Sequence, residues 1–265
     1  MYIVKNMDKK KFLLKLNSIV KKAKNREQMW LNILNNINHK NICEVGVWKG
    51  DFANTLLENL PKIKKYRFID PYRVLPDWNK PLNKSNKVFS EARQEALKKN
   101  KKFIKKIVEH RLTTKKASKH ILDNSQCFIY IDGDHTLKGI TIDLNNMLRK
   151  LNKNGVIGGD DFTKNIWQHG MDYDPTFVFP YAVYFAEAND LVIVSLPFKQ
   201  FLMFKSKKFA FVDYENYKKL SYKKIFNKPF LKIIFYKKFI IKFFDKLPYK
   251  IQDNLKRFAL TIFDK

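Results

Sequence analysis

The sequence predicts an α/β fold in which a mostly parallel β-sheet carries helices on both faces. From residue 42 onward, short apolar runs alternate with helix-like amphipathic segments, which is typical of β-α-β units. The chain has 265 residues, of which 45% are hydrophobic, and this is enough to bury the core of one large domain with an appendage. These observations exclude a wholly disordered chain.

Residues 1–40 precede the first strand and form a predicted N-terminal helical segment. Between residues 8 and 38, apolar side chains recur at helical spacing. They fall into two sets: Phe12, Leu13, Leu16 and Val20, and then Met29, Trp30, Ile33 and Leu34. One or two helices are therefore expected to lead into the sheet.

A predicted domain over residues 41–206 is defined by apolar runs of strand length. Helix-like segments separate the first five runs, which are residues 42–47, 66–70, 105–109, 127–132 and 155–159. A helix is expected from Tyr181 to Ala188. Two further runs, at 191–196 and 200–205, are expected to close the sheet as a hairpin-like pair.

Residues 207–265 differ in composition and form a predicted basic amphipathic C-terminal extension. Between Pro229 and Pro248, lysines gather on one side of a helical wheel and apolar residues on the other. A basic amphipathic helix can lie on an anionic membrane, which predicts peripheral membrane contact through residues 229–247. The alternative is that the apolar face packs on the main domain or on a second copy of the chain in a homo-oligomer.

The net charge of +28 raises the question of a nucleic-acid partner. Only seven of the 53 basic residues are arginine, and the lysines are scattered along the chain. Proteins that read nucleic-acid grooves favour the arginine fork, and the sequence contains no recognisable nucleic-acid module. Nucleic acid is therefore not the expected partner.

The sequence also predicts a compartment. It contains no stretch of about 20 uncharged apolar residues and no signal-peptide core. Cys43 and Cys127 each enter an apolar run, which is typical of buried free thiols in a reducing cytosol. We expect a cytoplasmic protein, with any membrane contact peripheral and on the inner face.

The first candidate site follows the first strand, because ligands of open parallel sheets bind at the carboxyl ends of strands. Glu44, Gly46, Trp48 and Gly50 lie on the turn between this strand and a helix. Glycines let the backbone approach a ligand, and a helix N-terminus favours anionic groups. The absence of a G-x-G-x-x-G fingerprint argues against a nicotinamide enzyme.

Asp70 ends the second strand, where an acidic side chain commonly accepts hydrogen bonds from ribose hydroxyls. The alternative is a turn-forming Asp before Pro71. Its combination with the turn after the first strand favours the ribose interpretation.

Four carboxylates follow two strands that are expected to be neighbours: Asp132, Asp134, Asp160 and Asp161. Carboxylates so close together repel one another unless a cation neutralises them. Hard oxygen ligands suit Mg²⁺, Mn²⁺ or Ca²⁺ better than Zn²⁺. The alternative is that these residues act as helix caps and turn formers.

Together the motifs resemble class I S-adenosylmethionine (SAM)-dependent methyltransferases. Within that class they are similar to the metal-dependent sugar O-methyltransferases of the macrocin and novobiocin type and the wider group around them. The similarity covers roughly residues 41–205 and rests on Gly46-Val47-Trp48-Lys49-Gly50, Asp70-Pro71-Tyr72-Arg73-Val74-Leu75-Pro76, Asp132-Gly133-Asp134, and Leu151-Asn152-Lys153-Asn154-Gly155 before Asp160-Asp161-Phe162.

The resemblance implies a Rossmann-like sheet of order 3-2-1-4-5-7-6 with one antiparallel strand. It implies that SAM is held by Glu44, Gly46, Trp48, Gly50, Asp70 and Asp132. It further implies Mg²⁺ (or Mn²⁺) ligation by Asp132, Asp160 and Asp161. The implied acceptor is a sugar or nucleotide-linked sugar, or a surface-glycan precursor.

Catalysis by this set would begin at the acceptor hydroxyl, whose pKa falls on coordination to Mg²⁺. Asp134 is the expected general base, and His135 is the rival base or a residue that orients its neighbours. The sequence departs from the sugar enzymes at His135, Thr136 and Leu137, which leaves the substrate open.

Two other functions remain alternatives. A nucleic-acid (RNA) methyltransferase is suggested by charge, but Asp-Gly-Asp-His stands where base amino methyltransferases present Asp-Pro-Pro-aromatic or its Asn variant. A non-catalytic membrane or partner-binding module on the same fold is disfavoured by the intact acidic set.

Overall fold

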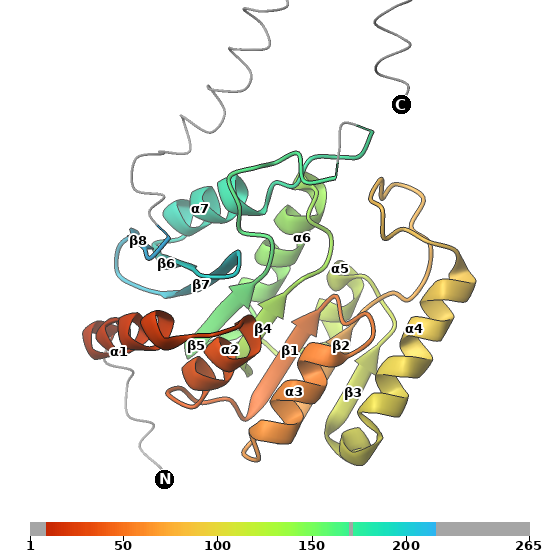
Figure 1. The fold of residues 1–265 in the computed structure, drawn as a ribbon, viewed down its shortest axis with the longest axis horizontal. Coiled ribbons are helices and arrows are strands. Elements are labelled where there is room, and N and C mark those ends of the chain that lie inside the picture. The colour runs from red at the N-terminus through yellow and green to blue at the C-terminus, as the bar shows by residue number, and fades with distance from the viewer. Residues whose placement is uncertain (1–8, 170–171, 216–265) are drawn as a thin grey trace, which may run out of the picture. The chain divides into compact units, whose positions relative to one another are not determined.

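The computed structural model describes residues 9–169 and 172–215 (Figure 1). The helices are α1 (Lys9–Lys22), α2 (Arg26–Leu34), α3 (Asp51–Asn59), α4 (Asn86–Lys99), α5 (Thr114–Ala117), α6 (Leu137–Leu148) and α7 (Val178–Ala188), with 3-10 turns η1 (Lys101–Lys106) and η2 (Ser118–His120). The strands are β1 (Asn41–Val45), β2 (Lys65–Ile69), β3 (Ile107–His110), β4 (Gln126–Ile131), β5 (Leu151–Gly159), β6 (Leu191–Leu196), β7 (Gln200–Lys205) and β8 (Ala210–Asp213).

These strands form one eight-stranded sheet in the order β3-β2-β1-β4-β5-β7-β6-β8. The first five strands are parallel, and β7 runs antiparallel to both β5 and β6. The order 3-2-1-4-5-7-6 is confirmed. β8 pairs in parallel with β6, so the sheet continues one strand past the boundary expected at residue 206.

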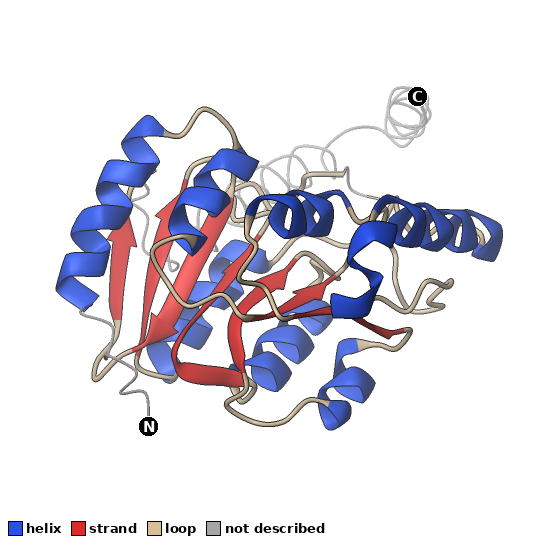
Figure 2. Cartoon of the chain, turned by 90° about the horizontal axis from the view of Figure 1, so that it is seen from below, coloured by secondary structure: helices blue, strands red, loops and turns tan. Residues whose placement is uncertain are grey.

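Helices cover both faces of the sheet, as predicted (Figure 2). α1 to α4 contact one another in sequence along one face, and α5, α6 and α7 do so on the other. Side chains that cap helix N-termini explain where several helices begin: Asn25 accepts from the Gln28 N–H, Ser85 from Val88 and Thr136 from Gly139.

The N-terminal helices are part of the core of this domain. Trp30 on α2 is fully buried, and its indole N–H donates to Gln200 Oε1 at 2.9 Å. A Cβ atom at Gly158 would come within 2.2 Å of the Trp30 ring, so this glycine allows α2 to pack directly on β5. Phe128 and Tyr130 of β4 complete the aromatic cluster around Trp30.

Two sequence predictions concern local chemistry and chain topology. Cys43 and Cys127 are buried free thiols, as expected. Within residues 9–169 and 172–215, no helix is long and apolar enough to cross a bilayer. The amphipathic segment predicted at residues 229–247 lies outside the described residues.

Candidate functional site

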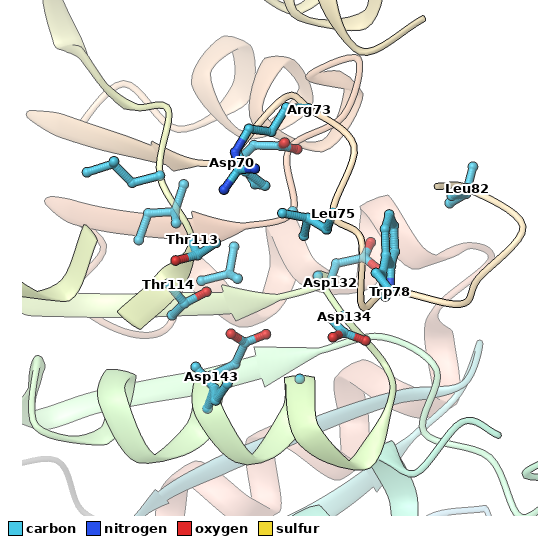
Figure 3. Close-up of a pocket in the computed structure, with 18 of the residues that line it drawn as sticks. Asp70, Arg73, Leu75, Trp78, Leu82, Thr113, Thr114, Asp132, Asp134 and Asp143 are labelled. Atoms are coloured by element: carbon cyan, nitrogen blue, oxygen red, sulfur yellow. The ribbon is translucent and has the colours of Figure 1, made fainter. Parts of the chain in front are cut away.

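A cavity of about 380 Å³ lies at the carboxyl ends of β1, β2 and β4 (Figure 3). Its walls come from the turns after these strands, from the segment after β2, from the loop after β3 and from the first half of α6. The predicted site residues on its wall are Gly46, Trp48, Asp70, Asp132 and Asp134. The topology therefore brings residues from distant parts of the sequence to one edge of the sheet.

Asp70 is held in the wall by three backbone N–H groups. Its Oδ2 accepts from the amides of Val47 and Trp48, each at 3.0 Å, and its Oδ1 accepts from the amide of Tyr72 at 2.9 Å. Burial raises the pKa of this carboxyl, and the three N–H groups oppose that effect. Trp48 and Tyr72 adopt positive φ angles of 50° and 47°, so the backbone on both sides is shaped around the carboxylate.

Gly46 lets the end of β1 approach the end of β4. Its φ is +81°, and a Cβ atom there would lie 1.9 Å from the carbonyl oxygen of Asp132. The close approach is fixed by the Asp132 amide, which donates to the Val45 carbonyl at 2.8 Å. The glycine is therefore required by the backbone at the floor of the cavity.

Glu44 and Gly50, two of the predicted cofactor-binding residues, lie outside the cavity lining. Glu44 is buried on β1, where it accepts a hydrogen bond of 2.6 Å from the Tyr66 hydroxyl, and burial raises its pKa to about 8. Gly50 caps α3 with a φ of +72° and packs against Ala96 and Asn100 of α4 and its C-cap. Glu44 thus joins β1 to β2 and Gly50 begins α3, and neither residue lines the cavity.

Asp134 enters the cavity from the N-terminus of α6. Its Oδ1 accepts from the Thr136 amide at 2.9 Å. Gly139 makes room for it, because a Cβ atom at this position would lie 2.2 Å from Asp134 Cγ. The sequence analysis did not predict this role for Gly139, because it depends on how the turn before α6 folds back onto the helix.

Asp160 is neutralised by side chains of the protein itself. Its Oδ2 accepts from Arg26 Nη1 at 2.7 Å, and its Oδ1 accepts from Gln200 Nε2 at 2.7 Å. Burial raises the pKa of Asp160 to about 6, and the nearby Asp132 adds to the shift, against the effect of Arg26. Arg26 comes from α2, outside the motifs that predicted the site, and no feature of its spacing indicated this contact.

His135 bridges two of the remaining carboxylates. Its Nδ1 lies 2.5 Å from Asp161 Oδ2, and its Nε2 lies 3.3 Å from Asp132 Oδ1 without hydrogen-bond alignment. Burial lowers the pKa of His135, but the two carboxylates outweigh burial and raise it to about 10. The imidazole is therefore cationic at neutral pH.

The residues predicted to hold Mg²⁺ do not fit a metal site as they are arranged. In the described part of the chain, no group of three or more His, Cys, Asp or Glu side chains is placed to hold a metal ion. The physical reason is that Arg26 and His135 supply the positive charge that Asp132, Asp160 and Asp161 were expected to need from a metal. The arrangement therefore does not support the expected magnesium or manganese site.

A third cation, Lys80, lies near the carboxylates of Asp134 and Asp161. The sequence analysis did not predict it. Its Nζ donates to the Asp174 carbonyl at 2.7 Å and to Thr176 Oγ1 at 3.1 Å. Burial lowers its pKa, and the carboxylates of Asp134, Asp161 and Asp174 oppose that effect. These bonds tie the segment after β2 to the segment before α7.

Comparison with known proteins identifies a family to which part of the chain is similar. Residues 43–162 match a protein family described as "Methyltransferase domain". This part of the chain is therefore similar to methyltransferase domains. Its position coincides with β1 to β5, which carry Gly46, Asp70 and the acidic residues. The sheet order is that expected for the class I methyltransferases.

Several solved structures are similar to the chain at low sequence identity. A putative caffeoyl-CoA O-methyltransferase from Staphylococcus aureus is 12% identical, with a TM-score of 0.50, over 75% of this chain and 99% of that one. The SAH-bound Podospora anserina methyltransferase PaMTH1 is 16% identical, with a TM-score of 0.46, over 74% and 88%. An rRNA methylase from Streptococcus thermophilus is 11% identical, with a TM-score of 0.44, over 68% and 96%. No curated protein sequence matches the chain.

Residues 43–162 also contribute cavity residues that the sequence did not indicate. Among them are Trp78 and Leu82 from the segment after β2, Thr113 and Thr114 at the start of α5, and Asp143 from α6 (Figure 3). No motif marks these positions, because they meet only when the loops fold over the sheet edge.

Proposed function

We propose that this chain is a SAM-dependent O-methyltransferase that methylates a hydroxyl group of a sugar or nucleotide-linked sugar. The observation that carries the proposal is the position of Asp70, fixed by backbone amides beside Gly46 in the wall of a cavity within a methyltransferase domain. A carboxylate held in this way can accept hydrogen bonds from the two hydroxyls of a ribose.

The rest of the cavity suits a nucleoside cofactor. Gly46 allows the ligand to approach the backbone, and Pro71, Leu112 and Ile142 supply apolar wall. When bound, SAM supplies an electrophilic methyl group on a sulfonium centre. Asp132, at the cavity floor, places negative charge where a sulfonium would be accommodated.

Asp134 is the proposed general base. Its Oδ1 is anchored by the Thr136 amide, so Oδ2 is available for the proton of an acceptor hydroxyl. Transfer of that proton as the oxygen attacks the methyl carbon avoids an oxonium product. His135 is already cationic and engaged with Asp132 and Asp161, so its role here is to orient these carboxylates.

Two features support a sugar acceptor. The motifs resemble the sugar O-methyltransferases, and Trp78 lines the cavity at the same end as Asp134 (Figure 3). An aromatic face can stack on a sugar ring while polar groups pair with its hydroxyls. No step of the proposal passes through a metal, because Asp160 and Asp161 are paired with Arg26 and His135.

The proposal is tested by titrating the full chain calorimetrically with S-adenosylhomocysteine (SAH) and then assaying methyl transfer from labelled SAM to a panel of nucleotide sugars. We expect micromolar SAH binding and transfer to at least one sugar. Asp134→Asn is expected to lower turnover by about 10²-fold or more without weakening SAH binding. Asp123→Asn, on the surface beside Lys150, is the matched control and should retain full turnover.

A metal arm completes the experiment. Turnover is expected to survive an excess of EDTA, since the chain's own cations neutralise the acidic edge. Loss of turnover in EDTA and its recovery with Mg²⁺ would overturn this part of the proposal. If the folded protein does not bind SAH, the whole proposed function is wrong. If the protein methylates RNA and no sugar, the proposed sugar acceptor is wrong and RNA is the acceptor.

A further inference from the structure

A cluster of polar side chains lies on one face of β2 and β3, outside the cavity lining. Arg67 lies within β2, and His110 ends β3 in register with Ile69. Because side chains alternate along a strand, Arg67, Ile69 and His110 share one face. Tyr66 and Phe68 point to the other face, into the core. A charged and a titratable side chain therefore stand where a sheet usually packs apolar residues.

His120, on η2, packs on the same face and completes an Arg–His cluster of Arg67, His110 and His120. The imidazole rings of His110 and His120 are stacked, with centroids 6.2 Å apart and planes inclined by 21°. Arg67 and His110 are half-buried, whereas His120 is exposed. The cluster therefore meets solvent at His120, whose exposed ring can turn between rotamers.

Several donors of the Arg–His cluster are unused. Arg67 Nη1 donates to Gln126 Oε1 at 3.2 Å, and Arg67 Nε is buried without a hydrogen-bond partner. The edge of the guanidinium formed by Nε and Nη2 is thus left for a ligand. His110 Nε2 is also buried and unpaired. Since buried polar atoms are normally hydrogen-bonded, these atoms indicate a missing acceptor.

The positive charges of the Arg–His cluster repel one another. Burial, then Arg67 and then His120 lower the pKa of His110. Burial also lowers the pKa of Arg67, and the Cys43 thiol opposes that effect. Within residues 9–169 and 172–215, no carboxylate contributes to either shift. The cluster therefore lacks a balancing negative charge.

The surrounding elements add positive charge. Glu109 precedes His110 on β3, but its side chain points to the opposite face and pairs with Arg93 of α4. The residues of α5 and η2 beside the cluster include three lysines: Lys115, Lys116 and Lys119. An anion from solution is the species that can supply the missing charge and the missing acceptor.

We propose that Arg67, His110 and His120 bind a phosphate group at a site separate from the SAM cavity. A phosphate offers three strong acceptor oxygens, and the free edge of the Arg67 guanidinium can bind two of them at once. The His120 ring donates to the third oxygen, and its turning away from His110 opens the buried nitrogens to the ligand. Two sources share this chemistry: a soluble phosphate monoester and a phospholipid headgroup. The inference does not depend on the proposed function.

The first test titrates inorganic phosphate calorimetrically into the full chain at about pH 6, where an imidazole of ordinary pKa is mostly protonated. We expect saturable binding with a Kd of about 1 mM or tighter. Arg67→Gln and His120→Gln are each expected to weaken it by about tenfold or more. His120 is exposed, so its substitution leaves the core intact.

Lys119→Gln is the matched control, because Lys119 is also exposed and adjoins His120. It should change the phosphate affinity by less than about threefold. An equal loss in Lys119→Gln and His120→Gln would overturn the inference, because it would show that phosphate responds to the general charge of the chain. Absence of saturable binding would also overturn it.

Histidine NMR gives a readout that a purely structural role would not move. A bound anion favours the protonated imidazole, so saturating phosphate is expected to raise the pKa of His110 and of His120 by about one pH unit. The signal of His120 is assigned by its loss in His120→Gln. If phosphate leaves both pKa values unchanged, the inference is wrong.

Vesicles distinguish the two sources of phosphate. Phosphatidic acid presents a phosphate monoester, whereas phosphatidylglycerol presents a diester. If the full chain prefers phosphatidic acid at equal surface charge, and His120→Gln removes that preference, the site takes a lipid headgroup. If inorganic phosphate binds and the two vesicles bind equally, the site takes a soluble phosphate monoester. Either result supports the site.

Discussion

Asp70 combines two duties at the scale of a single residue. Its oxygens accept three backbone N–H bonds that hold the turns after β1 and β2, and the same carboxylate faces the cavity. Substituting it therefore alters both the stability of the turns and the affinity for a ribose.

Asp70→Asn is expected to lower both quantities. The amide has one acceptor oxygen, and its NH₂ group would face a backbone N–H donor. We expect a loss of about 1–3 kcal/mol in the free energy of unfolding, measured by urea denaturation. We also expect a clear loss of SAH affinity by calorimetry, and unchanged affinity would contradict the ribose assignment.

Glu44 makes stability depend on pH. Burial raises its pKa from an ordinary value of 4.5 to about 8, so the native state holds the proton more tightly than the unfolded chain. Its contribution is fully present below pH 4.5 and is lost as the pH rises toward about 8. Glu44→Gln mimics the neutral carboxyl and does not undergo this loss.

The free energy of unfolding of Glu44→Gln, relative to the unsubstituted protein, is therefore expected to rise between pH 5 and pH 8. The rise approaches about 1.4 kcal/mol for each pH unit within that window. Glu95→Gln is the control and should show little pH dependence in this window, because Lys49 lowers the pKa of the exposed Glu95 and the carboxyl is largely ionised above pH 5 in both states. If the difference in unfolding free energy between Glu44→Gln and the unsubstituted protein does not vary with pH, the pKa of Glu44 is the same in the folded and unfolded states, and the prediction is wrong.

Residues whose roles depend on local backbone could be predicted from the sequence. Gly46 and Asp70 are examples, since the end of a strand and the following turn place both of them at the cavity. The pairing of Asp160 with Arg26 could not be predicted from the sequence, because the two residues lie 134 positions apart. Repulsion among carboxylates indicated a cation, but it did not specify that the cation belongs to the chain.

At the scale of elements, α2 contributes Arg26 to the site from outside residues 43–162, the part of the chain that matches the methyltransferase family. It buries Trp30 against Gly158 and directs Arg26 to Asp160. Helical spacing predicted this helix. The packing of this helix on β5 could not be predicted, because the need for glycine at position 158 is apparent only when the Trp30 ring is seen to lie against it.

Trp30→Ala is expected to destabilise the protein by about 3–5 kcal/mol, because it leaves a cavity and unpairs Gln200 Oε1 from the indole. Urea denaturation measures the change. Leu14→Ala on α1 is the control: that side chain is 67% exposed, and its loss should change stability by less than about 0.5 kcal/mol. Similar effects of the two substitutions would contradict the packing of α2 on the sheet.

The predicted strands were confirmed where apolar runs are short and bounded, as in β1, β2 and β4. β8 was missed because its four residues, Ala210–Asp213, are only partly buried and lie in a Lys- and Phe-rich stretch. The edge position of β8, beside β6, explains its weak signal, because an edge strand needs less apolar surface.

For the whole molecule, the dominant property is a net charge of +28. We expect the full chain to co-sediment with vesicles containing anionic phosphatidylglycerol, and to dissociate as salt is raised. Replacing Lys232, Lys238, Lys242 and Lys246 by Gln should weaken this association if residues 229–247 make the contact. Neutral phosphatidylcholine vesicles are the control, and equal binding of the substituted chain would remove this segment from the interaction.

The bond between Trp30 and Gln200 joins residues 170 positions apart. A ribosome adds about 5–20 residues each second, so on the order of ten to thirty seconds separate the synthesis of these two side chains. The apolar side of α2 has no cover from β5 until residue 159 has been made, and none from β7 until the end of that interval. The α2 helix is thus made well before the strands that bury it, and its apolar side is a surface that a nascent-chain chaperone would meet.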